Sequence, residues 1–313
     1  MAAYIDPQVE ALLQRIKEAG RAPFWQGTAK QARTTPSLMR MLFGDAPLLH
    51  RVEERVIDAD TGQVPVRVYI PNAKPAGAIV YFHGGGWVIG SVADYDAFTA
   101  TLAQRTGCAV ISVDYRLAPE HPYPAPLHDA MAALDWAAAH SKNLLGVEPG
   151  KLIVAGDSSG ANLATVAVRR HNARPTTRRY DFQVLAYPVT DAYFDTASYR
   201  EFAEGRLLTR ADMMWFWDQY APHPALRDDP DLSPLRADTL VDCPPALILV
   251  AALDPLRDEG ERYAEKLRQE GVAVEAIRCE GLVHGFLSMV HLAPGAAQAF
   301  DHIVNAIRAK IAQ

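Results

Sequence analysis

The chain has 313 residues, of which 49% are hydrophobic and 22% charged, and its formal net charge is −6. The acidic balance argues against nucleic acid as a partner, because a phosphate backbone attracts basic surfaces. The longest apolar run, Ala246 to Leu253, has eight residues, whereas a membrane-spanning helix needs about 20, so we expect no membrane span.

The N-terminal 48 residues predict helices that are too short to form a core of their own. Apolar residues recur at helical spacing from Val9 to Ile16, and a second helix is predicted over residues 36–43. From residue 50 onward, short apolar runs alternate with helical stretches. The predicted strands are Val52 to Ile57, Val64 to Ile70, Ala78 to Phe82, Ala109 to Val113, Leu152 to Ala155, Phe182 to Tyr187, Ala246 to Ala251 and Ala273 to Arg278. This alternation is typical of an α/β fold with a mostly parallel eight-stranded sheet.

An aromatic-rich stretch of roughly 60 residues interrupts this alternation between the strands at 182–187 and 246–251. Within it, Thr209 followed by Asp212 resembles a capping box, and a helix is predicted to Tyr220. We therefore expect residues 188–235 to be an insertion. The predicted organisation is 1–48 and 188–235 as a helical cap, with 49–187 and 236–313 as the two parts of the core.

The strongest motif is Gly156-Asp157-Ser158-Ser159-Gly160. It follows a predicted strand and opens a predicted helix, which is the context of a nucleophile elbow. Small residues flank the serine because this turn leaves no room for side chains. The motif predicts Ser158 as a nucleophile.

A second motif, His83-Gly84-Gly85-Gly86-Trp87, directly follows the strand Ala78 to Phe82. Consecutive glycines allow backbone N–H groups to converge on one point, as in an oxyanion hole. The spacing matches neither a dinucleotide-binding nor a Walker motif, so a phosphate loop is the weaker interpretation.

A nucleophilic serine needs a base, and the base needs an orienting acid. Among the histidines, His284 alone lies in a loop directly after the last predicted strand. The acid should follow the strand Ala246 to Ala251, where Asp254 and Asp258 compete. We favour Asp254, because Asp258 falls on the next predicted helix.

These motifs together resemble the hormone-sensitive-lipase-like bacterial carboxylesterases, which are α/β-hydrolases of the GDSAG type. The resemblance covers nearly the whole chain and rests on His83-Gly84-Gly85-Gly86-Trp87, Asp114-Tyr115-Arg116-Leu117-Ala118-Pro119-Glu120, Gly156-Asp157-Ser158-Ser159-Gly160, Asp254-Pro255-Leu256-Arg257-Asp258 and His284-Gly285-Phe286. One departure is Ser159, where the family usually has Ala.

The resemblance implies a serine carboxylesterase acting on short- to medium-chain esters through an acyl-enzyme, without metal or other cofactor. The implied residues are Ser158, Asp254 and His284 as the triad, Gly85, Gly86 and Ser159 as the oxyanion hole, and His83, Asp157 and Asp258 as structural support. We expect Trp87, Tyr187, Trp215 and Phe286 to line the substrate pocket. Trp25, Phe43, Phe216 and Trp217 are further large side chains expected in the cap.

The implied partner besides the ester substrate is a second copy of the chain, because the last strand, Ala273 to Arg278, should be a sheet edge through which the family often dimerises. Cys108, Cys243 and Cys279 are too sparse for a disulfide framework, and the first residues lack a signal-peptide pattern, so we expect a cytoplasmic protein. Three alternatives stay open: an amide-cleaving hydrolase, a lipase acting at an oil–water interface, and a non-catalytic small-molecule binder on the same fold.

Overall fold

The structure, a computed structural model, describes residues 4–313 except 21, 36, 146–149 and 176. Its centre is an eight-stranded sheet with the order β1-β2-β4-β3-β5-β6-β7-β8. The strands are β1 (Arg51–Ala59), β2 (Gly62–Ile70), β3 (Gly77–Phe82), β4 (Ala109–Val113), β5 (Lys151–Asp157), β6 (Phe182–Ala186), β7 (Ala246–Leu253) and β8 (Val274–Val283). Strand β2 runs antiparallel to both of its neighbours, β1 and β4, and all other neighbouring strands pair in parallel. The predicted α/β fold and its eight strands are confirmed, with ends displaced by up to a few residues.

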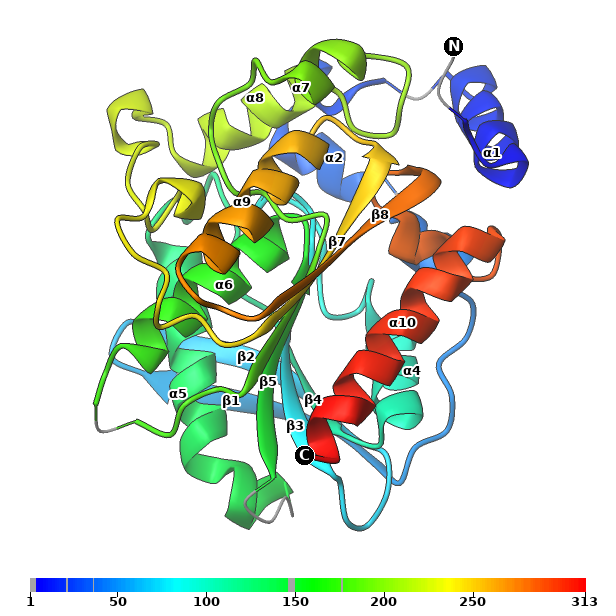
Figure 1. The fold of residues 1–313 in the computed structure, drawn as a ribbon. Coiled ribbons are helices and arrows are strands. Elements are labelled where there is room, and N and C mark those ends of the chain that lie inside the picture. The colour runs from blue at the N-terminus through cyan, green and yellow to red at the C-terminus, as the bar shows by residue number, and fades with distance from the viewer. Residues whose placement is uncertain (1–3, 21, 36, 146–149, 176) are drawn as a thin grey trace.

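Helices cover both faces of the sheet (Figure 1). Every residue of β3, β4 and β7 is buried, as expected for parallel strands packed on both sides. One face carries α4 (Asp96–Thr106) and α10 (Pro294–Ile311), and the other carries α5 (Ala125–Leu145), α6 (Ser159–Asn172) and α9 (Arg257–Gln269). These layers fix the strand ends, from which the functional side chains project.

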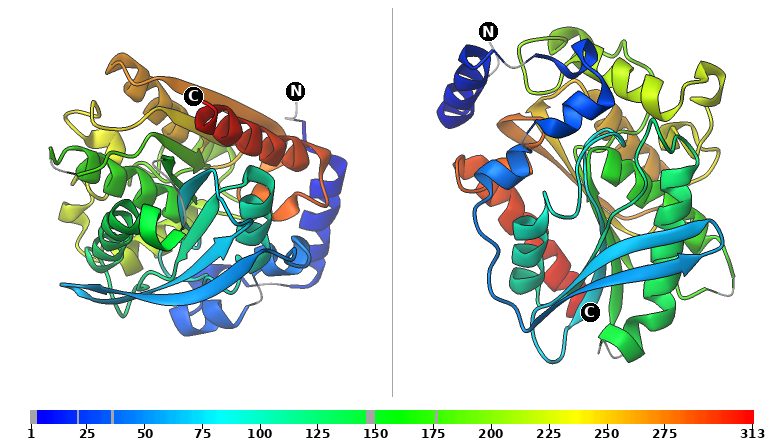
Figure 2. Two further views of the ribbon diagram at one scale, coloured as in Figure 1. Left: turned by 90° about the horizontal axis from the view of Figure 1, so that it is seen from below. Right: turned by 180° about the vertical axis from the view of Figure 1, so that it is seen from behind.

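The insertion (residues 188–235) and the helices of the N-terminal segment (residues 4–48) lie toward the carboxyl ends of the parallel strands, whereas the end of that segment runs down beside the sheet to β1 (Figures 1 and 2). The N-terminal segment contains α1 (Pro7–Glu18), the 3₁₀ turn η1 (Phe24–Gln26), α2 (Ala29–Thr34) and α3 (Leu38–Leu42). The insertion contains α7 (Ala197–Glu201), α8 (Arg210–Tyr220) and the 3₁₀ turns η2 (Pro224–Leu226) and η3 (Pro234–Arg236). The last of these turns ends one residue after the insertion. Residues 1–3, 21 and 36 of the predicted N-terminal part lie outside the described residues.

Contacts join these two segments to each other and to the core. The predicted capping box of α8 is present, and the carboxylate of its Asp212 also accepts a hydrogen bond from the Trp25 backbone N–H at 3.3 Å. Arg33 of α2 donates to the carbonyl oxygens of Val88 and Ala118 at 2.8 and 2.7 Å. Helix α2 was not predicted from the sequence, although Thr28 and Gln31 form a capping box at its start.

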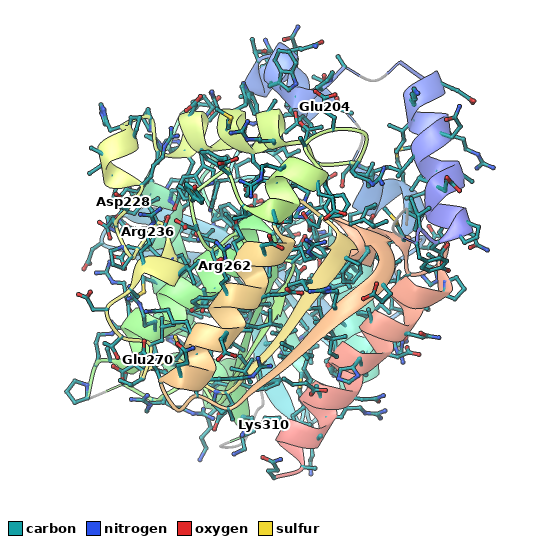
Figure 3. The ribbon with its side chains drawn as sticks, turned by 45° about the horizontal axis from the view of Figure 1, so that its top comes forward. Glu204, Asp228, Arg236, Arg262, Glu270 and Lys310 are labelled. Atoms are coloured by element: carbon teal, nitrogen blue, oxygen red, sulfur yellow. The ribbon has the colours of Figure 1, made fainter. Side chains whose placement is uncertain are left out.

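The two ends of the insertion are tied together by Arg236. Its guanidinium pairs with Asp191 at 2.6 Å and with Asp228 at 2.8 Å, and Figure 3 shows Asp228 and Arg236 near each other on the outer surface. The Leu235 N–H also donates to the carbonyl oxygen of Thr190 at 3.0 Å. The insertion therefore leaves and rejoins the core at one place.

Strand β8 forms one edge of the sheet, as predicted, although it extends to Val283. A final 3₁₀ turn, η4 (Phe286–Met289), follows it. The thiols of Cys108, Cys243 and Cys279 are all free and buried. Among the helices in the described part of the chain, none has the length and apolarity to cross a membrane.

Candidate active site

The turn between β5 and α6 places Ser158 in a backbone conformation that L-residues rarely adopt, with φ 54° and ψ −121°. The neighbouring glycines permit this turn. A Cβ on Gly156 would lie 2.5 Å from Gly160 backbone atoms, and one on Gly160 would lie 2.1 Å from the Phe82 carbonyl oxygen. Because backbone packs directly on backbone here, only glycine fits at positions 156 and 160. The resulting tight turn projects Ser158 above the sheet.

Three side chains from the ends of different strands meet at this turn. The Nε2 atom of His284 lies 2.9 Å from the Ser158 Oγ, and its Nδ1 atom lies 2.7 Å from Asp254 Oδ2. Asp254 is fully buried, and its other oxygen accepts the Leu256 backbone N–H at 2.9 Å. The structure thus brings together a serine, a histidine and an aspartate in the order that a nucleophilic triad requires.

The rival acid, Asp258, lies apart from this group in the first turn of α9. Its Oδ2 atom accepts a hydrogen bond from the Ser198 backbone N–H at 2.9 Å, and the Ser198 hydroxyl donates to the Pro255 carbonyl oxygen at 2.7 Å. Asp258 therefore attaches α7 of the insertion to the loop that carries Asp254. The two aspartates thus have different neighbours: Asp254 contacts His284 from a loop, and Asp258 contacts Ser198 from a helix.

The glycine loop beside Ser158 is packed too closely for side chains. Gly85 and Gly86 have φ values of 124° and 59°. A Cβ on Gly85 would lie 2.1 Å from the Ile89 carbonyl oxygen, and one on Gly86 would lie 2.2 Å from the ring of Phe216. Within the described residues, the backbone N–H groups of both glycines have no acceptor. Ser159 opens α6, where backbone N–H groups have no acceptor in their own helix.

Beneath the loop lies the buried carboxylate of Asp157. Its Oδ1 atom accepts hydrogen bonds from the Tyr81 hydroxyl at 2.7 Å and the Gly84 N–H at 2.9 Å, and its Oδ2 atom accepts from the Tyr95 hydroxyl at 2.9 Å. Burial raises the pKa of Asp157, and the two tyrosine hydrogen bonds oppose that rise. Burial lowers the pKa of the adjacent His83. Asp157 and His83 both contact Gly84 of the loop, whereas Tyr81 and Tyr95 carried no signal in the sequence.

A cavity of about 870 Å³ opens above Ser158, within the range typical of small-molecule sites. The core contributes Ser158, His284, Tyr187 and residues of the 84–95 segment, and the N-terminal segment contributes residues of the 32–41 stretch. The apolar side chains from elsewhere are Phe24, Leu207, Leu208, Met213 and Phe216. The ring of Tyr187 lies 4.8 Å from the His284 imidazole, centroid to centroid.

The expected pocket residues Trp87, Trp215 and Phe286 do not line this cavity. Trp87 is fully buried, and its indole stacks on Tyr220 with ring centroids 4.2 Å apart. Phe286 is also fully buried and packs edge-on against Tyr187. Trp215 packs behind Phe216 on α8. Each of the three follows or precedes a residue that lines the cavity, but neighbouring residues of a turn or helix point in different directions.

Of the further aromatic residues expected in the cap, Phe216 alone lines the cavity. Trp217 packs against Trp87, Phe43 packs against Phe98 and Phe300, and Trp25 is 47% exposed. The stretch from Ala32 to Met41 was not predicted to line the pocket. Its mixture of polar and apolar residues gives no periodic signal that would distinguish a cavity wall from an ordinary surface.

Fold and geometry together define a serine hydrolase of the α/β-hydrolase fold. A family model described as alpha/beta hydrolase fold matches residues 79–288. Carboxylic ester hydrolase LipN of Mycobacterium tuberculosis is 41% identical over 281 residues, covering 85% of this chain and 73% of its own length. Ethyl acetate hydrolase of Pseudomonas putida is 35% identical and covers 97% of this chain and 98% of its own.

The solved structure of a hyperthermophilic esterase from the archaeon Pyrobaculum calidifontis superimposes with a TM-score of 0.91 at 37% identity, covering 98% of each chain. The chain therefore belongs to the hormone-sensitive-lipase-like carboxylesterases, serine hydrolases with a Ser-His-Asp triad.

Proposed function

We propose that this carboxylesterase uses Ser158 as its nucleophile, His284 as its base and Asp254 as the orienting acid. The carboxylate of Asp254 accepts a hydrogen bond from the His284 Nδ1–H, which holds the tautomer whose Nε2 is free to accept the Ser158 proton. The Ser158 Oγ then forms a bond to the ester carbonyl carbon, and the proton moves to Nε2. The single observation that carries this proposal is the Ser158–His284–Asp254 chain, at 2.9 and 2.7 Å.

The backbone N–H groups of Gly85, Gly86 and Ser159 are proposed to hold the oxyanion formed in this step. Such preorganised donors stabilise the charge that develops in the transition state. His284 next gives its proton to the leaving alcohol, and a water molecule hydrolyses the acyl-enzyme by the same route. His83 and Asp157 are proposed to support the glycine loop, and Asp258 to fasten the insertion.

The substrate is proposed to be an ester with a short to medium acyl chain. The N-terminal segment and the insertion act as a cap, which closes an apolar wall over Ser158. Each buried CH₂ group contributes about 0.8 kcal/mol, so affinity grows with chain length until the cavity is full. Hydrolysis of p-nitrophenyl esters is expected to peak at roughly four to eight carbons, given the cavity size.

Replacement of Ser158 tests the proposal. Ser158→Ala is expected to lower ester hydrolysis by at least about 10⁴-fold, because triad members act as a unit, while circular dichroism and the melting temperature stay close to those of the parent. Ser112→Ala is a matched control, since Ser112 in β4 is also buried and its hydroxyl has no partner among the described residues. Activity above a few per cent in Ser158→Ala would refute the assignment.

The relatives' names favour esters over the alternatives. LipN and the Pseudomonas protein are named as ester hydrolases, and His284, which a non-catalytic binder does not need, lies within hydrogen-bond distance of Ser158. Parallel assays with an ester and its matching amide would detect an amide-cleaving enzyme.

The protein is further proposed to be a cytoplasmic homodimer that pairs through β8. Strand β8 is an open edge, and Glu275, Ala276 and Arg278 on it are exposed; exposed edges readily pair with another chain. Three free thiols suit a reducing compartment. Light scattering should give a dimer at micromolar concentration and a monomer for Ala276→Lys. A monomeric parent protein would contradict the pairing, and recovery in the periplasmic fraction would contradict the compartment.

A further inference from the structure

The residue after the nucleophile makes a contact that an alanine there could not make. The Oγ atom of Ser159 accepts a hydrogen bond from the Trp87 backbone N–H at 3.2 Å. Ser159 is fully buried, and Trp87 ends the glycine loop with a φ of 59°. The side chain of Ser159 thus joins the start of α6 to the carboxyl end of the loop that carries Gly85 and Gly86.

A tyrosine extends this contact to the other end of the loop. The Tyr115 hydroxyl donates to the His83 carbonyl oxygen at 2.7 Å. Burial raises the pKa of Tyr115, and a hydrogen bond from the Ser159 side chain opposes that rise. The Tyr115 hydroxyl donates its hydrogen bond to the His83 carbonyl, and the Ser159 oxygen accepts one from the Trp87 N–H. The Ser159 hydroxyl is therefore oriented to donate to the Tyr115 oxygen. One chain therefore runs from the Trp87 N–H through both hydroxyls to the His83 carbonyl.

This hydroxyl chain spans the part of the loop that has the least resistance to movement. Gly85 and Gly86 have positive φ values, and glycine moves between backbone conformations at little steric cost. The contacts at His83 and Trp87 fix the residues on either side of these glycines. Both hydroxyls are in a buried site, where an unpaired polar group is costly, so each contact supports the other.

We propose that the Ser159 hydroxyl is a positioning group for the oxyanion hole, acting through Trp87 and Tyr115 on the N–H groups of Gly85 and Gly86. This inference rests on the proposed role of those N–H groups as oxyanion donors. Ser159 consequently has two separate parts in the site: its backbone N–H faces the oxyanion, and its side chain holds the loop.

The test uses Ser159→Ala, Tyr115→Phe and the double variant. Each is assayed for ester hydrolysis and for inhibition by an alkyl trifluoromethyl ketone. Ser158 adds to the ketone carbonyl, its proton passes to His284, and the resulting hemiketal oxygen carries the negative charge into the oxyanion hole. The affinity for this inhibitor therefore depends directly on the positions of the oxyanion donors. Binding of the ester itself depends on them only weakly, because the oxyanion has not yet formed.

Loss of a whole oxyanion donor lowers kcat about 10²–10³-fold. A variant that keeps every donor but allows the glycine loop to move should lower kcat by less than this. Ser159→Ala is expected to lower kcat about 5- to 20-fold with KM within about twofold, and to weaken the trifluoromethyl ketone by the same factor as kcat/KM. Tyr115→Phe should give a similar loss. The double variant should lose less than the product of the two single losses, because both interrupt one chain.

Unchanged kcat and unchanged trifluoromethyl ketone affinity in Ser159→Ala would overturn the inference, even if the melting temperature falls. If Ser159→Ala does not fold, Tyr115→Phe carries the same readouts, with Ser112→Ala as the control. Ser158→Ala keeps the two proposals separate. An inactive Ser158→Ala beside a fully active Ser159→Ala refutes the positioning role alone, whereas an active Ser158→Ala refutes the proposed function.

Discussion

The two walls of the cavity are built on different principles. On the core side, the glycine loop and the nucleophile turn are shaped by backbone packed against backbone, and a Cβ on Gly85 or Gly160 would lie 2.1 Å from a carbonyl oxygen. On the cap side, side chains such as Leu208, Met213 and Phe216 form the wall. Substitution on the first wall should destroy the reaction, whereas substitution on the second should change its selectivity.

In this molecule, chemistry is expected to depend on one wall and specificity on the other. Donor groups for an oxyanion must be fixed before the reaction begins, and close packing of a buried backbone achieves this. On the other wall, Leu208, Met213 and Phe216 fill space with their side chains, so replacement of one of them is expected to change the shape of the cavity. The two walls meet at Gly86 and Phe216, where the ring lies over the loop.

The largest expected effect is the difference in kcat between a variant of Asp254 and the same variant of Asp258. Asp254→Asn should reduce kcat by about 10³–10⁴-fold, because the neutral amide can no longer hold the working His284 tautomer. Asp258→Asn should reduce it no more than a few-fold, since Asp258 accepts the Ser198 N–H and only supports the insertion. Steady-state kinetics on one ester measures both; equal or reversed losses would overturn the assignment.

Gly86→Ala is expected to lower kcat about 10²–10³-fold, which is the scale of losing one oxyanion donor. The new Cβ would meet the Phe216 ring at 2.2 Å, at a φ of 59° that suits glycine. Adding Phe216→Ala should restore part of the rate by relieving the contact, but not the backbone strain. No recovery in the double variant would show that the two walls do not meet at this point.

Phe216→Ala alone should move the acyl preference toward longer chains by about two to four carbons, because removal of the ring lengthens the cavity. A series of p-nitrophenyl esters measures the optimum from kcat/KM. Trp215→Ala is the matched control, since it removes a ring from the same helix that does not line the cavity. An equal shift in both variants would mean that α8 as a whole, rather than the Phe216 ring, sets the limit.

The smallest expected effect concerns Glu259, which fastens the start of the insertion. Its carboxyl is buried and accepts the Thr190 N–H at 2.7 Å, and burial raises its pKa well above 4.5. The folded protein therefore holds this proton more tightly than the unfolded chain, so the stability contribution of Glu259 falls as pH rises above about 4.5.

Glu259→Gln cannot ionise, so its free energy of unfolding relative to the parent should rise with pH, by about 1 kcal/mol or more between pH 5 and 7.5. Urea unfolding at several pH values measures this difference. Glu265→Gln, on the exposed side of the same helix, should leave the parent's pH trend unchanged. A constant difference between Glu259→Gln and the parent would contradict the prediction.

The order of elements and the reacting groups were predictable because they rest on local patterns. The strands follow short apolar runs, the capping box at Thr209 begins α8, and glycine spacing marks both backbone turns of the site. The predicted pocket residues fared less well: Tyr187 lines the cavity, but Trp87, Trp215 and Phe286 do not. The direction in which a side chain points from a tight turn depends on the backbone dihedral angles, and the residue type does not specify these.

The sequence by itself determined the fold class, the nucleophile turn and the glycine loop, because each depends on residues adjacent in the chain and on steric limits that only glycine meets. Tertiary structure alone decided which residues form the cavity wall and that Ser159 and Tyr115 link the two ends of the glycine loop. Those relations join residues that are far apart in the chain, as when the Trp87 N–H donates to Ser159, 72 positions further on. Contacts over such separations arise from the packing of the whole sheet and its helices, and no local pattern encodes them.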